Sequence, residues 1–225
     1  MTPTSFVREI ASLKMSGVFN PYCDTCPVHD LSDAASIRRK NLRAYLASTK
    51  ELGVDTIWMG RDLGHRGGRR TGIALTDEVH LIAMNDLYPG HAYKRSTRGP
   101  AVAERTADEI WSILKQLSVP PFLWNVFPLH PHEIDNQLSN RRFTAKELRE
   151  VEDLNATLIS WLGIRQIIAI GQDAGAYASR FDVKVTTIRH PSYGGIRAFR
   201  AGMHDAYGRE WKSPSHIYQG TLSLS

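Results

Sequence analysis

Residues 54–60 read VDTIWMG, and residues 61–64 continue with RDLG. A short apolar run that ends at glycine and leads into a polar loop is typical of a buried strand in a parallel sheet. Comparable apolar runs occupy residues 122–126, 164–171 and 183–188. The sequence therefore predicts a central sheet of four parallel strands.

Helical segments separate these strands. Apolar residues recur at helical spacing over residues 110–117 and again over 148–162, where Thr144 and Glu147 form an N-terminal capping box. A weaker pattern predicts a third helix over residues 34–52. Strands that alternate with helices require right-handed crossovers, which cover a sheet on both sides. The predicted fold class is α/β, with a four-stranded parallel sheet flanked by helices on both faces.

Length and composition are compatible with a single domain over residues 1–225. A hydrophobic content of 42% supplies one core, and no repeat or linker divides the chain. The longest apolar runs fall short of the roughly 20 residues that a transmembrane helix needs, and the N-terminus lacks a signal-peptide core. We therefore expect a cytoplasmic monomer with no membrane partner.

Positive charge gathers in three stretches, at residues 61–70, 94–98 and 189–200. The net charge is +5 and the isoelectric point is about 9.3. Solvated surface charge is the ordinary explanation of each cluster, so charge alone gives little support for a nucleic-acid partner. The functional prediction therefore depends on the residues at the strand ends.

Polar residues follow all four predicted strands. In open α/β sheets, ligands bind in the crevice beyond the carboxyl ends of the strands. The four ends lead into GRDLG at 60–64, NVFP at 125–128, GQD at 171–173 and HPSYGG at 190–195. We expect these segments to face one crevice.

Three segments resemble the motifs of a known family. GRDLG, followed by RRTGIALTDE at 69–78, resembles the water-activating motif of the uracil-DNA glycosylase superfamily. HPSYGG matches its second motif, and LWNV at 123–126 lies where the superfamily keeps a base-reading asparagine. The resemblance extends over roughly residues 54–200 and implies the uracil-DNA glycosylase-like fold.

Two residues are the catalytic candidates. Hydrolysis of an N-glycosidic bond passes through a sugar with oxocarbenium character and an anionic base, so negative charge is needed near the sugar and donors near the base. The resemblance assigns Asp62 to positioning the water and His190 to donating to the base oxygen that gains charge. From the residues alone, each has an alternative to a catalytic role. Asp62 is then a carboxylate that caps a turn, and His190 is an ordinary loop histidine.

Base recognition is assigned to Asn125, Leu75, Gly64 and Arg61. The amide of Asn125 can pair with the N3–H and O4 edge that distinguishes uracil from cytosine, although an asparagine at a strand end can also bond a turn. Leu75 replaces the phenylalanine with which many members stack on the base. Gly64 replaces the tyrosine that blocks the thymine methyl group in the aspartate-bearing branch, which leaves thymine exclusion open.

The predicted DNA contacts outside the base pocket are Ser192, Tyr193, Ile196, Arg197, Arg69 and Arg70. Ser192 and nearby backbone amides would hold a phosphate, as would the three arginines. The side chain that fills the space left by a flipped base usually lies near Gly194. Glycine cannot fill that space, so its neighbours Tyr193, Ile196 and Arg197 are the candidates.

A short motif, CDTCPVHD, contains Cys23, Cys26 and His29. Some branches of the superfamily hold an iron–sulfur cluster on four cysteines, and their first pair looks similar. This chain has only two cysteines, and a zinc site would need His29 and a fourth ligand. We therefore predict no metal and no cofactor, and we expect residues 19–30 to form a packed loop before the first helix.

The sequence thus predicts a monofunctional uracil-DNA glycosylase of base excision repair, with uracil-containing DNA as its partner. Water would be the nucleophile, because no lysine occupies an identifiable nucleophile position, and the product would be an abasic site. Two alternatives stay open. One is a glycosylase for another deaminated or mismatched base, motivated by Gly64 and Leu75. The other is a protein that binds uracil or abasic sites with little catalysis.

Overall fold

The computed structural model describes residues 1–208. The C-terminal residues Trp211 and Tyr218, whose role the sequence leaves open, lie outside the described residues. In chain order, the elements are α1 (Pro3–Ser12), β1 (Val18–Phe19), α2 (Ala34–Glu51), β2 (Thr56–Asp62), α3 (Gly68–Thr71), α4 (Glu78–Leu81), α5 (Met84–Leu87), α6 (Arg105–Leu114), β3 (Phe122–Phe127), β4 (His130–Pro131), α7 (Ala145–Leu162), β5 (Gln166–Ile170), α8 (Gln172–Ala178), β6 (Lys184–Ile188) and α9 (Ile196–Tyr207).

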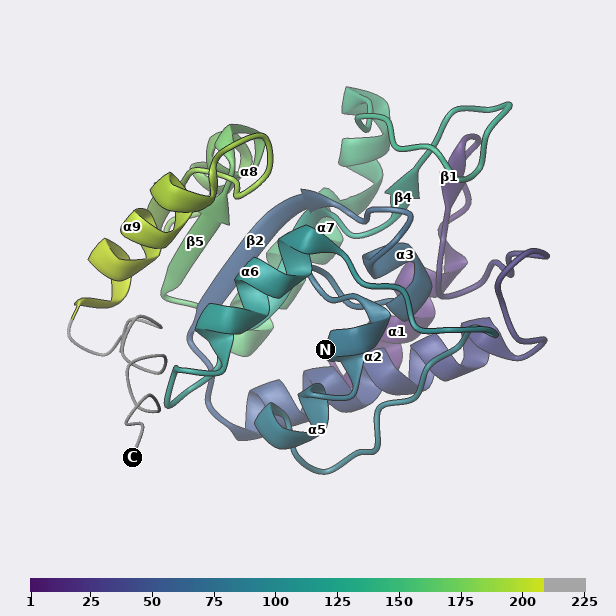
Figure 1. The fold of residues 1–225 in the computed structure, drawn as a ribbon, viewed down its shortest axis with the longest axis horizontal. Helices are drawn as coiled ribbons and strands as arrows, with labels where there is room; N and C mark the ends of the chain where they lie inside the picture. The colour runs from purple at the N-terminus through teal and green to yellow at the C-terminus, as the bar shows by residue number, and fades with distance from the viewer. Residues whose placement is uncertain (209–225) are drawn as a thin grey trace, which may run out of the picture.

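The central sheet has the strand order β3-β2-β5-β6, and every neighbouring pair is parallel. Ile57 of β2 pairs with Phe122 of β3 on one side and with Ile167 of β5 on the other. Figure 1 shows β2 and β5 running side by side. The predicted four-stranded parallel sheet is confirmed.

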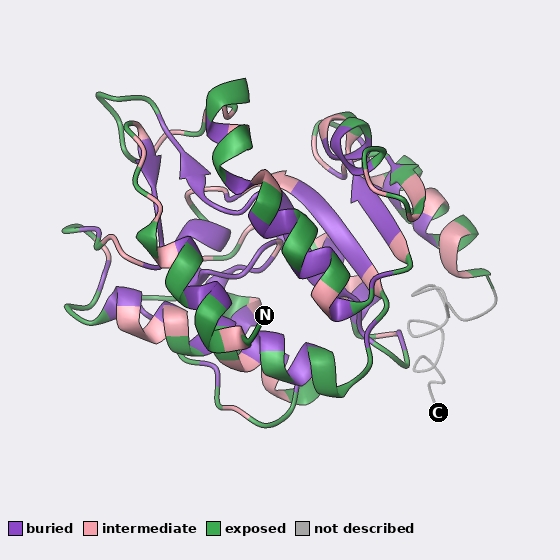
Figure 2. Ribbon diagram, turned by 180° about the vertical axis from the view of Figure 1, so that it is seen from behind, coloured by how far each residue is buried: buried purple, intermediate pink, exposed green. Residues whose placement is uncertain are grey.

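Two successive connections, from β2 to β3 and from β3 to β5, run in opposite directions along the sheet. From β2 the chain passes through α6 to β3, and from β3 it returns through α7 to β5 on the other side of β2. Right-handed crossovers place such helices on opposite faces. Figures 1 and 2 show α6 in front of the sheet in one view and α7 in front of it in the other. The prediction of helices on both faces is therefore confirmed.

The long helices begin and end where the sequence signals predict. In α7, the Thr144 side chain accepts a hydrogen bond from the backbone of Glu147, and the Glu147 side chain accepts one from the backbone of Thr144. Gly163 ends α7 with φ of 75°, a left-handed conformation that favours glycine. Within residues 1–208, no helix is both long enough and apolar enough to cross a membrane.

The core lies on both faces of the sheet, which Figure 2 shows as a buried layer between helices. The ring of Tyr45 in α2 stacks on Phe122 in β3, with 4.8 Å between centroids. On β2, Trp58 is fully buried, and its Nε1 donates to the Tyr207 hydroxyl of α9 at 2.7 Å. Because burial of one large apolar side chain contributes roughly 1.5–3 kcal/mol, these contacts fix the strands firmly.

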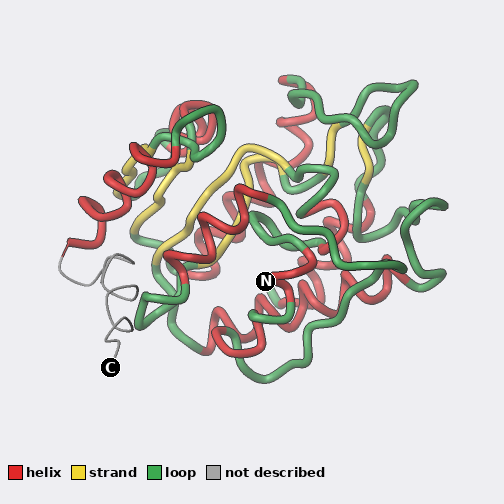
Figure 3. The backbone as a smooth tube through the Cα atoms, in the orientation of Figure 1, coloured by secondary structure: helices red, strands yellow, loops and turns green. Residues whose placement is uncertain are grey.

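Two regions differ from the sequence prediction. Residues 19–30 do not precede the first helix, because α1 comes earlier, with Thr2 as its N-cap and Phe6 and Ile10 buried on one face. This short helix has a clear apolar face and a capping box at Thr2, signals that the sequence prediction did not include. The second region is the segment from β2 to α6, which folds into the short helices α3, α4 and α5 joined by loops (Figure 3).

Candidate active site

A cavity of about 530 Å³ opens beyond the carboxyl ends of β2 and β5. After β2 the chain crosses to one face of the sheet, and after β5 it crosses to the other. Ligands of open α/β sheets bind beyond the strand ends at the point where the direction of the connections reverses in this way. The side chains that line the cavity include Arg61, Asp62, Leu75, Glu104, Asn140, Arg142, Asp173, Arg189, His190, Ser192 and Tyr193. The cavity therefore joins two of the three segments that resemble glycosylase motifs, GRDLG and HPSYGG, and its lining includes no residue of LWNV.

Asp62 is the last residue of β2, and its side chain is 9% exposed. Arg61 Nε donates to Asp62 Oδ2 at 2.6 Å, and Arg61 Nη1 lies 3.7 Å from Asp173 Oδ2. Burial raises the pKa of the Asp62 carboxyl, and the charge and hydrogen bond of Arg61 oppose this shift. Arg61, predicted to read the base, lines the cavity but donates to Asp62, so the structure gives it the role of holding that carboxylate.

His190 lies across the cavity in the loop after β6. Its Nδ1 accepts the backbone N–H of Ser192 at 3.1 Å, so the neutral ring carries its proton on Nε2. Burial, together with the charges of Arg61 and Arg189, lowers the pKa of His190 to about 4. At neutral pH, His190 is therefore a neutral imidazole that can donate from Nε2.

Asn125 approaches the site from β3, where it pairs in register with Gly60 of β2. A Cβ atom at residue 60 would lie 2.4 Å from Asn125 Oδ1, so glycine makes room for the amide. The Asn125 residue is 1% exposed, yet neither Oδ1 nor Nδ2 has a hydrogen-bond partner among the described residues. Because buried polar groups are nearly always paired, this amide is available for a ligand.

Two strained residues border the cavity. Within the described chain, Leu75 and Tyr193 are the non-glycine residues with positive φ, at 55° and 52°. Such conformations cost roughly 1–3 kcal/mol each and concentrate at functional sites. A Cβ atom at Gly60 would lie 3.0 Å from Leu75 Cδ2, which puts Leu75 beside the Asn125 amide. Tyr193 is 96% exposed and lies at the cavity rim.

Arg69 and Arg70 do not lie on a DNA-facing surface, which contradicts their predicted role as phosphate contacts. Arg69 is 2% exposed, and its guanidinium lies 3.9 Å from the centroid of the Phe19 ring. Arg70 is 6% exposed and pairs with Glu78, with 2.9 Å between Nε and Oε2. Because Arg69 and Arg70 both have partners inside the protein, this basic cluster is part of the scaffold.

The other predicted DNA contacts lie around one end of α9. Ser192 is half-buried beside His190, and its hydroxyl lies 2.8 Å from His190 Nδ1. Ile196 and Arg197 begin α9, with Ile196 half-buried and Arg197 exposed. Gly64 follows β2 on the cavity wall. Ser192 and Tyr193 thus line the cavity, whereas Ile196 and Arg197 are not among its lining residues.

Some cavity residues were missed by the sequence analysis, notably Glu104, Asn140 and Arg142. Arg142 is exposed and pairs with Asp173 at 3.0 Å. Asn140 Oδ1 accepts the backbone N–H of His65 at 3.0 Å. Glu104 immediately precedes α6, and no motif surrounds it. The helix predicted here covered residues 110–117, whereas α6 begins at Arg105, so the prediction did not reach Glu104.

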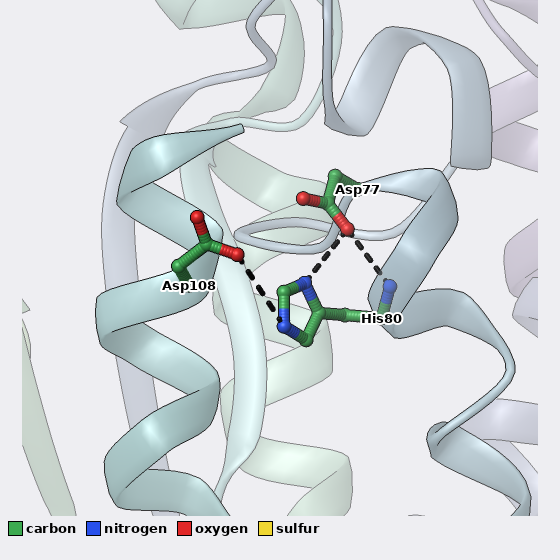
Figure 4. A group of neighbouring side chains, drawn as sticks. All are labelled: Asp77, His80 and Asp108. Atoms are coloured by element: carbon green, nitrogen blue, oxygen red, sulfur yellow. Dashed lines mark hydrogen bonds and ion pairs between the residues drawn. The ribbon is translucent and has the colours of Figure 1, made fainter. Parts of the chain in front are cut away.

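A second cluster, formed by Asp77, His80 and Asp108, lies beside the cavity wall (Figure 4). His80 Nδ1 and Asp77 Oδ1 are 2.8 Å apart, and His80 Nε2 lies 3.7 Å from Asp108 Oδ1. The candidate metal-ligand atoms lie within 4.8 Å of one another, but Asp77 already caps α4 and accepts the backbone N–H of Glu104 at 2.6 Å. The cluster thus fixes α6 against α4. Cys23 and Cys26 are free thiols outside it.

The sheet order and the cavity at its switch point define an α/β domain of the uracil-DNA glycosylase-like fold. Among solved structures, the chain is similar to wild-type SMUG2 of Pedobacter heparinus, a member of the uracil-DNA glycosylase superfamily, with a TM-score of 0.63. The two sequences are 15% identical, and the match covers 92% of this chain and 97% of that chain. No protein-family model matches this chain, and no curated protein matches it in sequence.

Proposed function

We propose that this protein is a monofunctional uracil-DNA glycosylase. The supporting observation is that one cavity is lined by Asp62 and His190, beside the unpaired amide of Asn125. Asp62 belongs to the GRDLG segment and His190 to the distant HPSYGG segment. This set supplies the negative charge, the donor and the base-reading edge that hydrolysis of an N-glycosidic bond to uracil requires. The fold of SMUG2 adds support at the level of fold alone.

Asp62 positions the attacking water in this mechanism. Its carboxylate accepts a hydrogen bond from the water and lies near the sugar, where positive charge develops as the bond to the base breaks. Arg61 holds the carboxylate at the end of β2 through a 2.6 Å hydrogen bond. As water attacks the anomeric carbon, its bond to N1 of the base breaks and the electron pair leaves with uracil as an anion. Asp62 accepts the proton of the water, and protonation of the released anion gives the free base and an abasic site.

His190 stabilises the departing base. The anionic uracil that forms carries negative charge on O2, and a neutral Nε2–H can donate to this oxygen. The Ser192 backbone N–H fixes the ring by donating to Nδ1. Because the ring is already neutral and oriented, little rearrangement is needed during the reaction.

Asn125 selects the base. Its Oδ1 accepts from uracil N3–H, and its Nδ2 donates to O4, so one amide pairs with two groups. Cytosine presents an acceptor at N3 and a donor at N4, which would face the amide with the wrong polarity. Leu75 packs on the face of the ring. In the orientation that reads uracil, the amide would stay unpaired against cytosine, at a cost of about 1–3 kcal/mol. Because no described residue bonds to the amide, packing around it must hold that orientation.

Tyr193 is the side chain that enters the space left by the flipped base. It is 96% exposed at the cavity rim, and its backbone is left-handed. Ile196 is half-buried at the start of α9, which makes it a poorer wedge. An exposed aromatic ring can insert into a base stack.

A labelled oligonucleotide with one uracil tests the proposal. The purified protein is incubated with U:G, U:A and single-stranded substrates, and alkali then cleaves any abasic site. We expect strand scission only after alkali, and loss of this scission in Asp62→Asn and His190→Ala variants.

Three other outcomes would contradict the proposal. Scission without alkali would show a lyase activity and a different mechanism. Tight binding to abasic DNA without release of uracil from any substrate would favour a binding protein. Faster release of hypoxanthine than of uracil under matched conditions would replace uracil as the substrate.

A further inference from the structure

A smaller cavity of about 250 Å³ adjoins the candidate active site, between the start of α7 and the helix α8. We call it the side pocket. It shares three lining residues with the larger cavity, namely Arg61, Arg142 and Asp173. Its other lining residues are Phe143, Leu148, Ala176, Tyr177 and Arg180. A ligand in the larger cavity therefore lies directly beside the side pocket.

Part of the side pocket is apolar and held firmly by the core. Phe143 and Leu148 are half-buried and pack against the core. The centroid of the Phe143 ring lies 5.3 Å from that of Phe127 in β3. Tyr177 is buried, and its hydroxyl accepts a hydrogen bond from Asn155 Nδ2 at 3.0 Å. These contacts fix the two aromatic rings, so they offer a preformed apolar surface to a planar group.

Exposed arginines border this apolar surface. The Arg180 guanidinium lies 5.4 Å from the centroid of the Tyr177 ring and pairs with Glu152. Arg142 Nη2 lies 3.0 Å from Asp173 Oδ2. Each of these two guanidiniums makes one ion pair with a described residue, so most of its N–H donors are free for a ligand.

This combination of groups fits a nucleotide. Bases stack on aromatic side chains and on guanidinium planes, and free guanidinium N–H groups bind phosphate. Pockets for drug-sized ligands have volumes of roughly 300–1,000 Å³, so the side pocket has room for one smaller planar group. A single base with its phosphate at the arginine rim meets these requirements.

The position of Asp62 indicates which part of the substrate is nearest to the side pocket. Arg61 Nε donates to Asp62 Oδ2 at 2.6 Å, and Arg61 Nη1 lies 3.7 Å from Asp173 Oδ2, which also pairs with Arg142. These charged groups connect the Asp62 carboxylate to the rim of the side pocket. Under the proposed function, Asp62 lies near the sugar. The sugar–phosphate strand, rather than the flipped base, is therefore the part of the substrate nearest to the side pocket.

We propose that the side pocket is a second nucleotide-binding site, which takes the base and phosphate of the nucleotide next to the flipped uracil. This inference rests on the proposed function. The neighbouring base covers the ring of Phe143, and its phosphate accepts from Arg142 or Arg180. The base can enter only when it is unpaired, because a paired neighbour would first have to leave its own stack.

The first test measures binding and does not depend on catalysis. The probe is a fluorescent single strand with one 2′-fluoro-2′-deoxyuridine, because the fluorine disfavours an oxocarbenium-like transition state and keeps the base attached. Ala176→Phe fills the side pocket, and Ala176 does not line the larger cavity. We expect the affinity for the single strand to fall roughly 5-fold or more, and the affinity for the same strand in a U:G duplex to stay near the native value.

Ala47→Phe is the matched control for this variant. Ala47 is also an exposed alanine within a helix, and it lines neither cavity. Arg180→Ala tests the phosphate contact separately. The slope of log affinity against log salt for the single strand should become shallower by roughly 0.7, the value expected for one lost phosphate contact. An unchanged slope would remove Arg180 from the site.

A second test removes the neighbouring base instead of changing the pocket. Two further probes carry a stable abasic residue on the 5′ or the 3′ side of the modified uridine. The native protein should bind one of these two probes roughly 5-fold more weakly than the intact probe. Ala176→Phe should bind all three with similar affinity. This comparison uses the native protein, so it decides the question even if Ala176→Phe fails to fold.

The outcomes separate this inference from the function on which it rests. Absence of uracil release together with the expected binding pattern would refute the glycosylase activity and leave the side pocket as a nucleotide site. Normal uracil release, with a folded Ala176→Phe that binds the single strand as tightly as Ala47→Phe, would refute the side pocket alone. Equal losses on single strand and duplex, or native affinities that ignore both abasic residues, would also refute it. Thermal melting of each variant checks that it is folded.

Discussion

The protein contains two groups of buried polar side chains, and they differ in whether they are paired. In the first group, Arg38 pairs with Asp30 at 2.5 Å and Arg70 pairs with Glu78 at 2.9 Å. Glu78 also accepts hydrogen bonds from the Thr97 hydroxyl and from the Val102 backbone. We call this group the arginine network.

The second group lies at the cavity. Asn125 is buried with an unpaired amide, and the partly buried carboxylate of Glu104 makes no ion pair with a described residue. A buried polar group that is paired stabilises the fold or costs little, whereas one that is unpaired destabilises it. Unpaired buried atoms also occur in the scaffold, for example at Arg69 Nε and Nη2, so the comparison depends on position at the cavity as well as on pairing. Substitutions in the arginine network should mainly lower stability, and those at the cavity should mainly lower activity.

Glu78→Ala should produce the largest loss of stability. Burial alone would raise the pKa of Glu78, but hydrogen bonds from Thr97 and Val102 and the charge of Arg70 lower it on balance. Removal of this carboxylate leaves Arg70 buried without its counterion, at a cost of about 3–5 kcal/mol in the free energy of unfolding. Denaturant titration measures this, with the exposed Glu150→Ala as control. A loss below about 1 kcal/mol would mean that the network is not structural.

Asp62→Asn should give the largest loss of activity. We expect uracil release to fall by roughly 10²-fold or more, because an amide cannot position and polarise the water as a carboxylate does. The thermal midpoint should stay close to the native value. Asp173→Asn, which alters another carboxylate near Arg61 in the same cavity, should have a smaller effect. Equal losses in both variants would indicate a general charge effect and remove Asp62 from its special role.

Asn125→Ala should lower activity and leave stability nearly unchanged. The amide has no hydrogen bond to lose, so the free energy of unfolding should change by less than about 1 kcal/mol, while kcat/KM for uracil falls roughly 10-fold or more. Asn155→Ala is the contrasting control. Asn155 is fully buried and bonds to Trp124, Val126 and Tyr177, so this variant should lose stability. A large destabilisation by Asn125→Ala would place Asn125 with the scaffold.

The pH dependence of stability is the most gradual of these effects. The pKa of His190 is about 4 in the folded protein and about 6.5 in an unfolded chain. Between these values the unfolded chain binds a proton that the folded protein does not, so stability is full above about pH 6.5 and decreases toward pH 4, by at most about 1.4 kcal/mol per pH unit. His130, with a pKa of about 3, contributes in the same direction.

Denaturant titration of the native protein and of His190→Ala between pH 4 and pH 8 measures the share of His190. The variant should show a shallower dependence on pH. In the native protein, kcat/KM should not fall between pH 8 and pH 6.5, because the reacting form of the ring is already neutral. A decrease with the midpoint of an ordinary histidine would contradict this assignment.

Sequence patterns predicted the sheet and its flanking helices because these depend on local apolar periodicity. The capping box at Thr144 and the apolar strand at residues 54–60 are such local signals. The positions of Asp62 and His190 on one cavity followed from the rule that parallel strands end at the same edge. These parts of the site could therefore be anticipated before the structure.

The remaining parts depend on contacts between distant segments. From the sequence, Arg69 and Arg70 were predicted to contact DNA at the surface. Their partners, Phe19 and Glu78, belong to other segments of the chain, so the sequence did not reveal these contacts. Glu104 carries no motif, and only the folding of α6 against the loop after β2 brings it to the cavity. Burial of a charged residue cannot be inferred from its immediate neighbours, so the sequence could not assign these roles.

The left-handed backbone of Leu75 and Tyr193 has a consequence for protein engineering. A search for heat-resistant variants would favour glycine at both positions, because glycine adopts this conformation without steric cost. The same replacements would remove the apolar surface beside the Asn125 amide and the exposed ring at the cavity rim. Selection for heat resistance alone would thus drift toward an inactive protein, so a library at these positions should be screened for base release as well as for melting temperature.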